Sequence, residues 1–144
     1  NREISQDMNE KHMSKTEIRL WIWGAMIIGT AVVLGAFGAH AVKQHVDEVA
    51  LGWWHTAADY QRVHGLGILA LAALWPRVQA VTQTKLILIA RCFVVGVLLF
   101  SGSLYTMTLT QMRFLGAITP VGGSLWILGW GLLIFALLKE SSNA

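Results

Sequence analysis

The segment LWIWGAMIIGTAVVLGAFGA, residues 20–39, decides the class of fold. It is a continuous apolar run without a single charged residue. The hydrocarbon core of a bilayer is about 30 Å thick and is crossed by about 20 helical residues, so this segment predicts a transmembrane helix. Ser14 and Glu17 precede it with the spacing of a capping box, and the helix is therefore expected to begin near Ser14.

The composition of the whole chain indicates the same class. Hydrophobic residues make up 55% of the 144 residues and charged residues 13%, whereas soluble domains carry about 25% charged residues. A single cysteine, Cys92, excludes an internal disulfide and a cysteine-based zinc site. The net charge of +3 is small and scattered, which does not favour a nucleic-acid partner.

Three further helices are expected after the first. The apolar run 63–75 is too short to span a bilayer alone, so its helix should begin near Trp53 to Thr56 and end at Pro76. Thr119 and Pro120 predict an N-cap followed by proline at the first helical position. We predict an all-α integral membrane protein, a bundle of four transmembrane helices at about 14–39, 55–75, 86–108 and 120–138. These helices form one domain, 14–139, between a solvated N-terminal tail, 1–13, and a C-terminal tail, 140–144.

The segment between the first two helices leaves two alternatives open. Val42, Val46, Val49 and Trp53 recur at helical spacing, which is typical of a short amphipathic helix on the membrane surface. A plain surface loop fits the same residues.

Basic residues in short flanking segments predict the orientation in the membrane. One side would hold Arg2, Lys11, Lys15, Arg19, Arg77, Lys85, Arg91 and Lys139, and the other Lys43, Arg62 and Arg113. We therefore expect a multi-pass protein of the bacterial inner membrane with both termini in the cytoplasm. Arg91, expected near the start of the third helix, should extend its side chain to the interface.

Several polar residues fall at membrane depth. At 1.5 Å per residue, His64 lies about 16 Å from Trp75, near the level of Ser101 and Ser103 on the third helix. Because isolated charges at this depth are costly, Asp59 and Arg62 are expected to pair. The third-helix hydroxyls should then face His64, Asp59 or Arg62 inside the bundle. The candidate polar cluster is His40, Asp59, Arg62, His64, Ser101, Ser103 and Tyr105.

Small residues predict where the helices touch, because helices in lipid associate through close packing. A groove lined by bare backbone is the alternative. The predicted packing residues are Ala31, Gly35, Gly38, Ala39, Gly102, Gly122 and Gly123.

Three motifs together resemble a known family. They are LGAFGAHAVK at 34–43, WHTAADYQRVHGLGIL at 54–69, and FSGSLYTMTLTQMRFLGAITPVGG at 100–123 followed by Gly129-Trp130. The chain is similar to the small inner-membrane family of YgdD-like proteins, domain of unknown function 423. Gln111 stands where the family pattern leads us to expect glycine. The resemblance implies a four-helix inner-membrane protein and brings no established activity.

The chemistry-bearing residues match no catalytic or metal-binding motif. A serine beside His64 and Asp59 has the residue types of a hydrolase, but the sequence has no nucleophile elbow. The outer-side histidines lack a close HxxxH spacing, so we predict no catalytic residue, no metal and no cofactor, with lipid as the one small-molecule ligand to expect.

The function predicted is that of a non-enzymatic accessory or assembly subunit of a membrane complex. Its partners would be membrane lipids and a larger membrane protein or further copies of itself. Two alternatives remain. One is an oligomeric small-solute transporter or channel, and the other is a protein that binds lipid or quinone in an outer-leaflet polar cleft.

Overall fold

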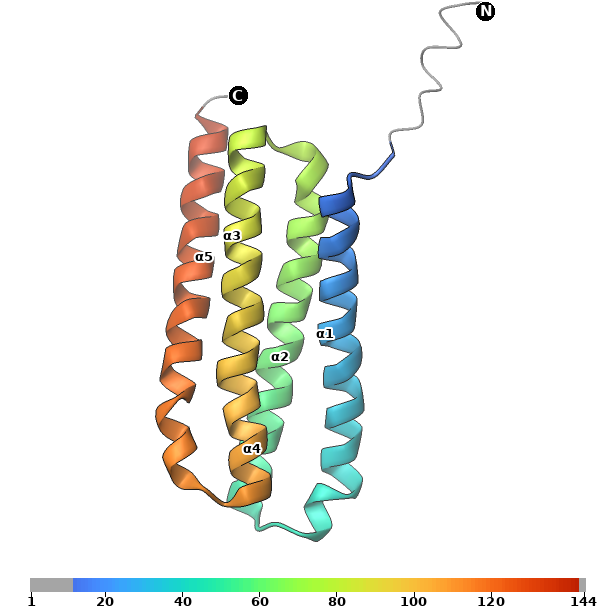
Figure 1. Cartoon of the computed structure of the whole chain (residues 1–144), viewed down its shortest axis with the longest axis vertical. Coiled ribbons are helices and arrows are strands. Elements are labelled where there is room, and N and C mark those ends of the chain that lie inside the picture. The colour runs from blue at the N-terminus through green and yellow to red at the C-terminus, as the bar shows by residue number, and fades with distance from the viewer. Residues whose placement is uncertain (1–11, 143–144) are drawn as a thin grey trace, which may run out of the picture.

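The computed structural model describes residues 12–142 and is entirely helical in that range, apart from the connections. Four long helical rods lie side by side (Figure 1). The first two are α1, Lys15–His40, and α2, Glu48–Leu74. The third consists of α3, Ala80–Gly96, a π-helical turn, Val97–Ser101, and α4, Gly102–Thr110. The fourth is α5, Thr119–Ser141. Short 3-10 turns at Val42–Gln44, Trp75–Arg77 and Arg113–Ala117 connect the rods.

Side-chain caps explain where the first two rods begin. Ser14 Oγ accepts a hydrogen bond from the backbone N–H of Glu17 at 3.1 Å, as the capping-box spacing predicted. Asp47 caps α2 in the same way, accepting from Ala50 N–H at 2.8 Å. Because of this second cap, α2 begins before the predicted Trp53–Thr56. The segment 41–53 is therefore neither a separate surface helix nor a plain loop, since its second half forms the first turns of α2.

The other two rods also differ from the predicted bounds. The Glu140 carboxylate accepts hydrogen bonds from Gln79 N–H, at 2.8 Å, and from the Thr82 hydroxyl. These bonds join the end of α5 to the start of α3, so α3 begins earlier than predicted and placing Glu140 in a tail was wrong. Thr119 is the first residue of α5 rather than its N-cap, and its hydroxyl bonds Ser103 instead. The predicted N-terminal tail lies almost wholly outside the described residues.

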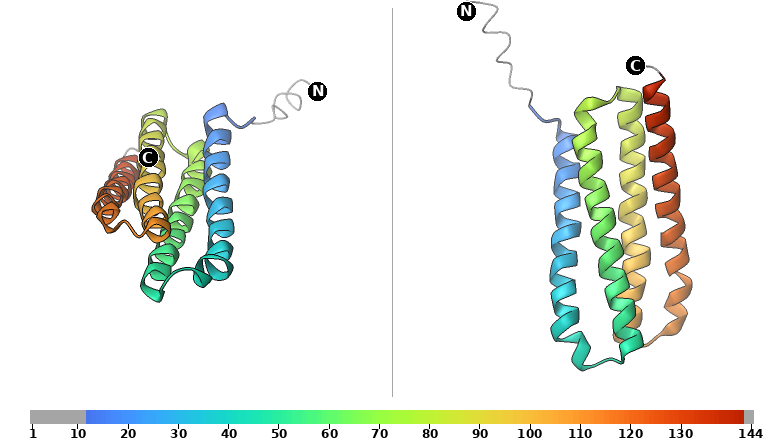
Figure 2. Two further views of the ribbon diagram at one scale, coloured as in Figure 1. Left: turned by 60° about the horizontal axis from the view of Figure 1, so that its bottom comes forward. Right: turned by 180° about the vertical axis from the view of Figure 1, so that it is seen from behind.

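The rods form an open row with α2 inside it. α1 packs along α2, α5 packs along α3, and α4 packs on α2. The views from the front and from behind place α1 and α5 at opposite edges of the row (Figures 1 and 2). The start of α1 and the end of α5 lie at the same end of the molecule (Figure 1).

Three segments of residues 12–142 are long and apolar enough to cross a membrane, namely Lys15–Gln44, Ala80–Thr110 and Arg113–Ser141. The exception is α2, whose apolar run is interrupted by Asp59, Gln61, Arg62 and His64. It also buries more residues than any other helix. The most polar rod, α2, is therefore the one that its neighbours bury most.

Close approach of the rods depends on a subset of the glycines. A Cβ on Gly38 of α1 would lie 2.4 Å from Trp54 Cδ1, and a Cβ on Gly122 of α5 would lie 2.5 Å from the backbone nitrogen of Phe100. Ala31 is fully buried. These three residues pack as predicted, and Gly24, Gly65, Gly67, Gly96 and Gly129 make further close contacts.

The other predicted packing positions are not close contacts. Ala39 is exposed, and a Cβ on Gly102 would have no neighbour within 4 Å. A Cβ on Gly35 or Gly123 would make only ordinary van der Waals contacts, at 3.7–3.8 Å. A strict four-residue repeat drifts around a helix that has about 3.6 residues per turn. The buried stripe of α1 therefore follows mixed spacings, through Leu20, Gly24, Ile27, Ala31 and Gly38.

Candidate functional site

His64 lies inside the molecule, on α2, with 3% of its surface exposed. Its Nδ1 is 2.8 Å from the carbonyl oxygen of Tyr60, and its Nε2 is 3.2 Å from Trp130 Nε1 on α5. A carbonyl only accepts and an indole N–H only donates. The imidazole is therefore neutral, with its proton on Nδ1, and both of its nitrogens are occupied.

Aromatic rings fill the space around this imidazole. The Trp126 ring stacks on it at 3.8 Å between centroids and 9° between planes, and the Phe93 ring meets it edge-on at 5.2 Å. Trp126 in turn donates its indole N–H to the Phe93 carbonyl at 3.2 Å. His64 was one of the three partners predicted for the third-helix hydroxyls, but none of them bonds it. Tyr60 O and Trp130 Nε1 take both ring nitrogens, and α5 tryptophans occupy the side that His64 faces.

Gln61 is the polar residue that joins α1, α2 and α4. Its Nε2 donates to Ile27 O at 3.0 Å and to Thr30 Oγ1 at 2.9 Å, both on α1. Its Oε1 accepts from the Tyr105 hydroxyl on α4 at 3.0 Å. Gln61 is not among the residues predicted from the sequence. A signal was present, since Ala57, Gln61, His64 and Ile68 recur at the spacing of one buried helix face.

The third-rod hydroxyls do face other helices, but they divide between two of them. Ser101 Oγ donates to Ala57 O of α2 at 2.8 Å, from the last position of the π-helical turn. Ser103 Oγ is 2.8 Å from Thr119 Oγ1 of α5. Thr108, which the sequence analysis did not select, donates to Ala50 O of α2 at 3.1 Å. The hydroxyl groups of the predicted cluster thus form separate interhelical hydrogen bonds rather than one connected group.

Asp59 and Arg62 form the predicted pair, at 2.7 Å, but on an outward face of α2. Their side chains are 64% and 44% exposed, respectively, so their placement inside the bundle was wrong. The Arg62 Nε also donates to Ala58 O at 3.3 Å. His55 is exposed on the same face, and His40 is exposed at the end of α1.

This ion pair lies near the middle of its helix. At 1.5 Å per residue, Arg62 is about 21 Å from Glu48 and about 18 Å from Leu74. A charged pair so far from both ends is costly if hydrocarbon surrounds it. Within residues 12–142, no three His, Cys, Asp or Glu side chains come together as a group that could hold a metal. The exposed pair is a candidate contact surface.

Residues 34–123, which include α2 and the whole third rod, match the family model described as "Protein of unknown function (DUF423)". The chain belongs to this family. That membership confirms the resemblance, and the exposed Asp59–Arg62 pair and the enclosed His64 both lie within the matched DUF423 region.

Relatives of this DUF423 chain carry the names of membrane proteins. A UPF0382 membrane protein of Staphylococcus epidermidis is 41% identical over 118 residues, covering 82% of this chain and 93% of the relative. The UPF0382 membrane protein YwdK of Bacillus subtilis is 39% identical, covering 82% and 94%. The UPF0382 inner membrane protein YgdD of Escherichia coli is 38% identical, covering 75% and 80%. No solved structure matches. With its three long apolar segments, this chain is a helical membrane protein.

Proposed function

We propose that this DUF423 protein is a non-enzymatic, four-span subunit of a larger complex in the bacterial inner membrane. Its partner chain binds the outward face of α2, which is defined here by His55, Asp59, Arg62 and Leu66. The exposed mid-helix ion pair carries this proposal.

Two features support four spans. At 1.5 Å per residue, the 27 residues of α2 extend about 40 Å, longer than a hydrocarbon core of about 30 Å. The start of α1 and the end of α5 share one end of the row, as an even number of crossings requires (Figure 1). Basic residues are more frequent at that end, which favours cytoplasmic termini. Those within the described residues are Lys15, Arg19, Arg77, Lys85, Arg91 and Lys139.

The free-energy cost of exposing the Asp59–Arg62 pair to hydrocarbon supports a partner that covers the outward face of α2. Asp59 and Arg62 satisfy each other only in part, because 64% and 44% of their side chains remain open to the surroundings. Each further lone pair or N–H would lack a partner in hydrocarbon, at a cost of several kcal/mol. A partner helix with polar side chains at this level would supply those hydrogen bonds.

In the alternative function, transport, the Asp59–Arg62 pair would have a different role. In a homo-oligomer, Asp59 and Arg62 would line a wet path between copies. A path through one copy has no support, since both nitrogens of His64 and the whole amide of Gln61 are engaged in internal bonds.

The test replaces the pair by leucine. Exchanging an ion pair for apolar residues is often neutral or stabilising for a fold. The double variant D59L/R62L should therefore keep the thermal stability of the isolated chain and lose the partner. Native electrophoresis of detergent-solubilised membranes would show the wild type in a larger species and D59L/R62L as the free chain.

The matched control substitutes exposed residues at the opposite edge of the row. Ile127 and Ile134 of α5 are 77% and 62% exposed, and I127A/I134A should leave the larger species intact. A wild-type chain that migrates alone would contradict the proposal. A species whose mass is a multiple of this chain's own would favour the homo-oligomer instead.

A further inference from the structure

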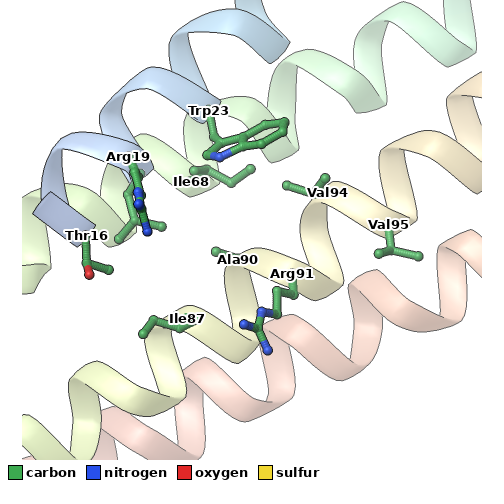
Figure 3. Close-up of a pocket in the computed structure, with 10 residues that line it drawn as sticks. Thr16, Arg19, Trp23, Ile68, Ile87, Ala90, Arg91, Val94 and Val95 are labelled. Carbon is green, nitrogen blue, oxygen red and sulfur yellow. The ribbon is translucent and has the colours of Figure 1, made fainter.

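An open groove of about 420 Å³ separates α1 from α3 at the end of the molecule where α1 begins (Figure 3). Ile68 of α2 lies between its two walls. α1 supplies Leu20 and Trp23, and α3 supplies Val94 and Val95. The groove exists because α1 rests on α2 without packing closely on α3. Farther along the row, the Gln61 and Tyr105 bonds connect α1 to α4 through α2.

Two arginines line this groove, and apart from them and Thr16 its lining residues are apolar. Arg19 comes from the second turn of α1 and Arg91 from α3, and no acidic residue is among the lining side chains (Figure 3). Both side chains are exposed. Within the part of the chain that the structure describes, neither guanidinium has a carboxylate within ion-pair distance. The groove thus presents positive charge with no internal counter-charge among residues 12–142.

The position of Arg91 along α3 adds to the evidence that the groove needs a counter-charge. Arg91 was predicted near the start of its helix, but α3 begins at Ala80, so Arg91 lies about 16 Å along the helix. An arginine this far into a membrane segment requires an anion or a route to the interface. The groove can hold such an anion, because Arg19 lies on its other wall, near the membrane surface.

We propose that this groove binds one anionic phospholipid. Its phosphate lies between Arg19 and Arg91, whose planar guanidinium groups donate paired hydrogen bonds to phosphate oxygens. One acyl chain follows the apolar floor and walls at Leu20, Ile68 and Val94. Charge and shape both favour this occupant over a peptide or a neutral lipid, and the basic end of the row is where anionic headgroups of the cytoplasmic leaflet would be met.

This site is distinct from the proposed partner face. Ile68 follows Leu66 by two residues, which places the groove and the partner face about 200° apart around α2. It is also distinct from the outer-leaflet cleft expected from the sequence, since it opens at the opposite end of the row. Either proposal can therefore fail without the other.

The experiment measures lipid binding to the purified full chain in neutral detergent. Native mass spectrometry and thermal unfolding would compare phosphatidylglycerol, phosphatidylcholine and glycerol 3-phosphate. Each arginine near the membrane surface is expected to contribute a factor of about five in affinity for an anionic lipid. R19Q/R91Q should therefore weaken phosphatidylglycerol binding by about 25-fold and leave phosphatidylcholine binding unchanged.

The control variant K15Q/K139Q removes the same charge at the same end but outside the groove, and it should bind phosphatidylglycerol like the wild type. R19K/R91K keeps the charge and should retain most of the preference, which separates lost binding from lost folding. Three results would overturn the site. These are a wild type without preference for phosphatidylglycerol, an equal loss in both glutamine double variants, and equal stabilisation by glycerol 3-phosphate, which would indicate a free-anion site.

Discussion

Trp130 of α5 donates its indole N–H to Nε2 of His64 on α2, at 3.2 Å, across the interior of the row. The bond connects the most polar helix to an edge helix that otherwise packs mainly along α3. It also selects the neutral imidazole, because a protonated Nε2 would point an N–H at another N–H. His64 is in this structure an interhelical hydrogen-bond partner enclosed by rings, rather than a free base.

The first prediction concerns this bond. Trp130→Phe keeps an aromatic ring and removes the donor, so Nε2 of His64 loses its partner. We expect a loss of about 1 kcal/mol in the free energy of unfolding. Unfolding in mild detergent would measure it. Trp21 of α1 is exposed to the same extent, 37%, and Trp21→Phe is the control. Equal stability of the two variants would show that the Trp130 bond contributes nothing.

The second prediction concerns the amide that links three helices. Gln61→Leu removes the hydrogen bonds to α1 and to Tyr105 together, whereas Tyr105→Phe removes only one of them. In a double-mutant cycle, Q61L/Y105F should cost less than the sum of the single variants, by about 0.5–1 kcal/mol. Strictly additive losses in the same unfolding assay would refute a direct bond between these residues.

The third prediction compares two glycines three residues apart on α1. Alanine at Gly38 would place its Cβ 2.4 Å from Trp54, while alanine at Gly35 would meet only Arg62, at 3.8 Å. Gly38→Ala should therefore destabilise the fold by about 1–3 kcal/mol, by overpacking. Gly35→Ala should be neutral or slightly stabilising, since alanine is the better helix former. A reversed order of the two melting temperatures would mean that α1 is rotated relative to α2.

These outcomes show what the sequence could and could not predict. Hydrophobic run length predicted the three apolar segments. His64 was expected inside the bundle, and its side chain is buried there. Depth does not determine the direction in which a side chain points around the helix axis. For that reason Ser101 and Tyr105 were correctly expected to face α2, but their partners are Ala57 O and Gln61 rather than His64.

The remaining errors also have physical causes. Asp59 and Arg62 were placed inside because a charge at depth should be buried. The packing of α1 and the third rod leaves both side chains largely exposed, and the Arg62 guanidinium lies only alongside Gly35 of α1. The Glu140 contacts with Gln79 and Thr82 connect residues that are far apart in the chain, and no local pattern indicates such a bond.

The fourth prediction concerns orientation. An accessibility reporter fused after Ala144 should be cytoplasmic, and one inserted between Lys43 and His45, in the connection between α1 and α2, should be external. Protease protection of right-side-out vesicles would compare the two. Identical protection of both reporters would contradict four spans, because one of the rods would then fail to cross.

Site-specific photo-crosslinking in living cells tests the central claim most directly, namely that the outward face of α2 contacts another membrane chain. A photoreactive residue would replace Leu66 on that face, or Ile134 on α5 as the control. These positions are 58% and 62% exposed and lie at similar distances from the basic end of the row. We predict that position 66 crosslinks to one defined protein of different sequence and that position 134 crosslinks only to lipid. Crosslinks to lipid alone at both positions, or to a second copy of this chain at position 66, would contradict the proposed subunit role.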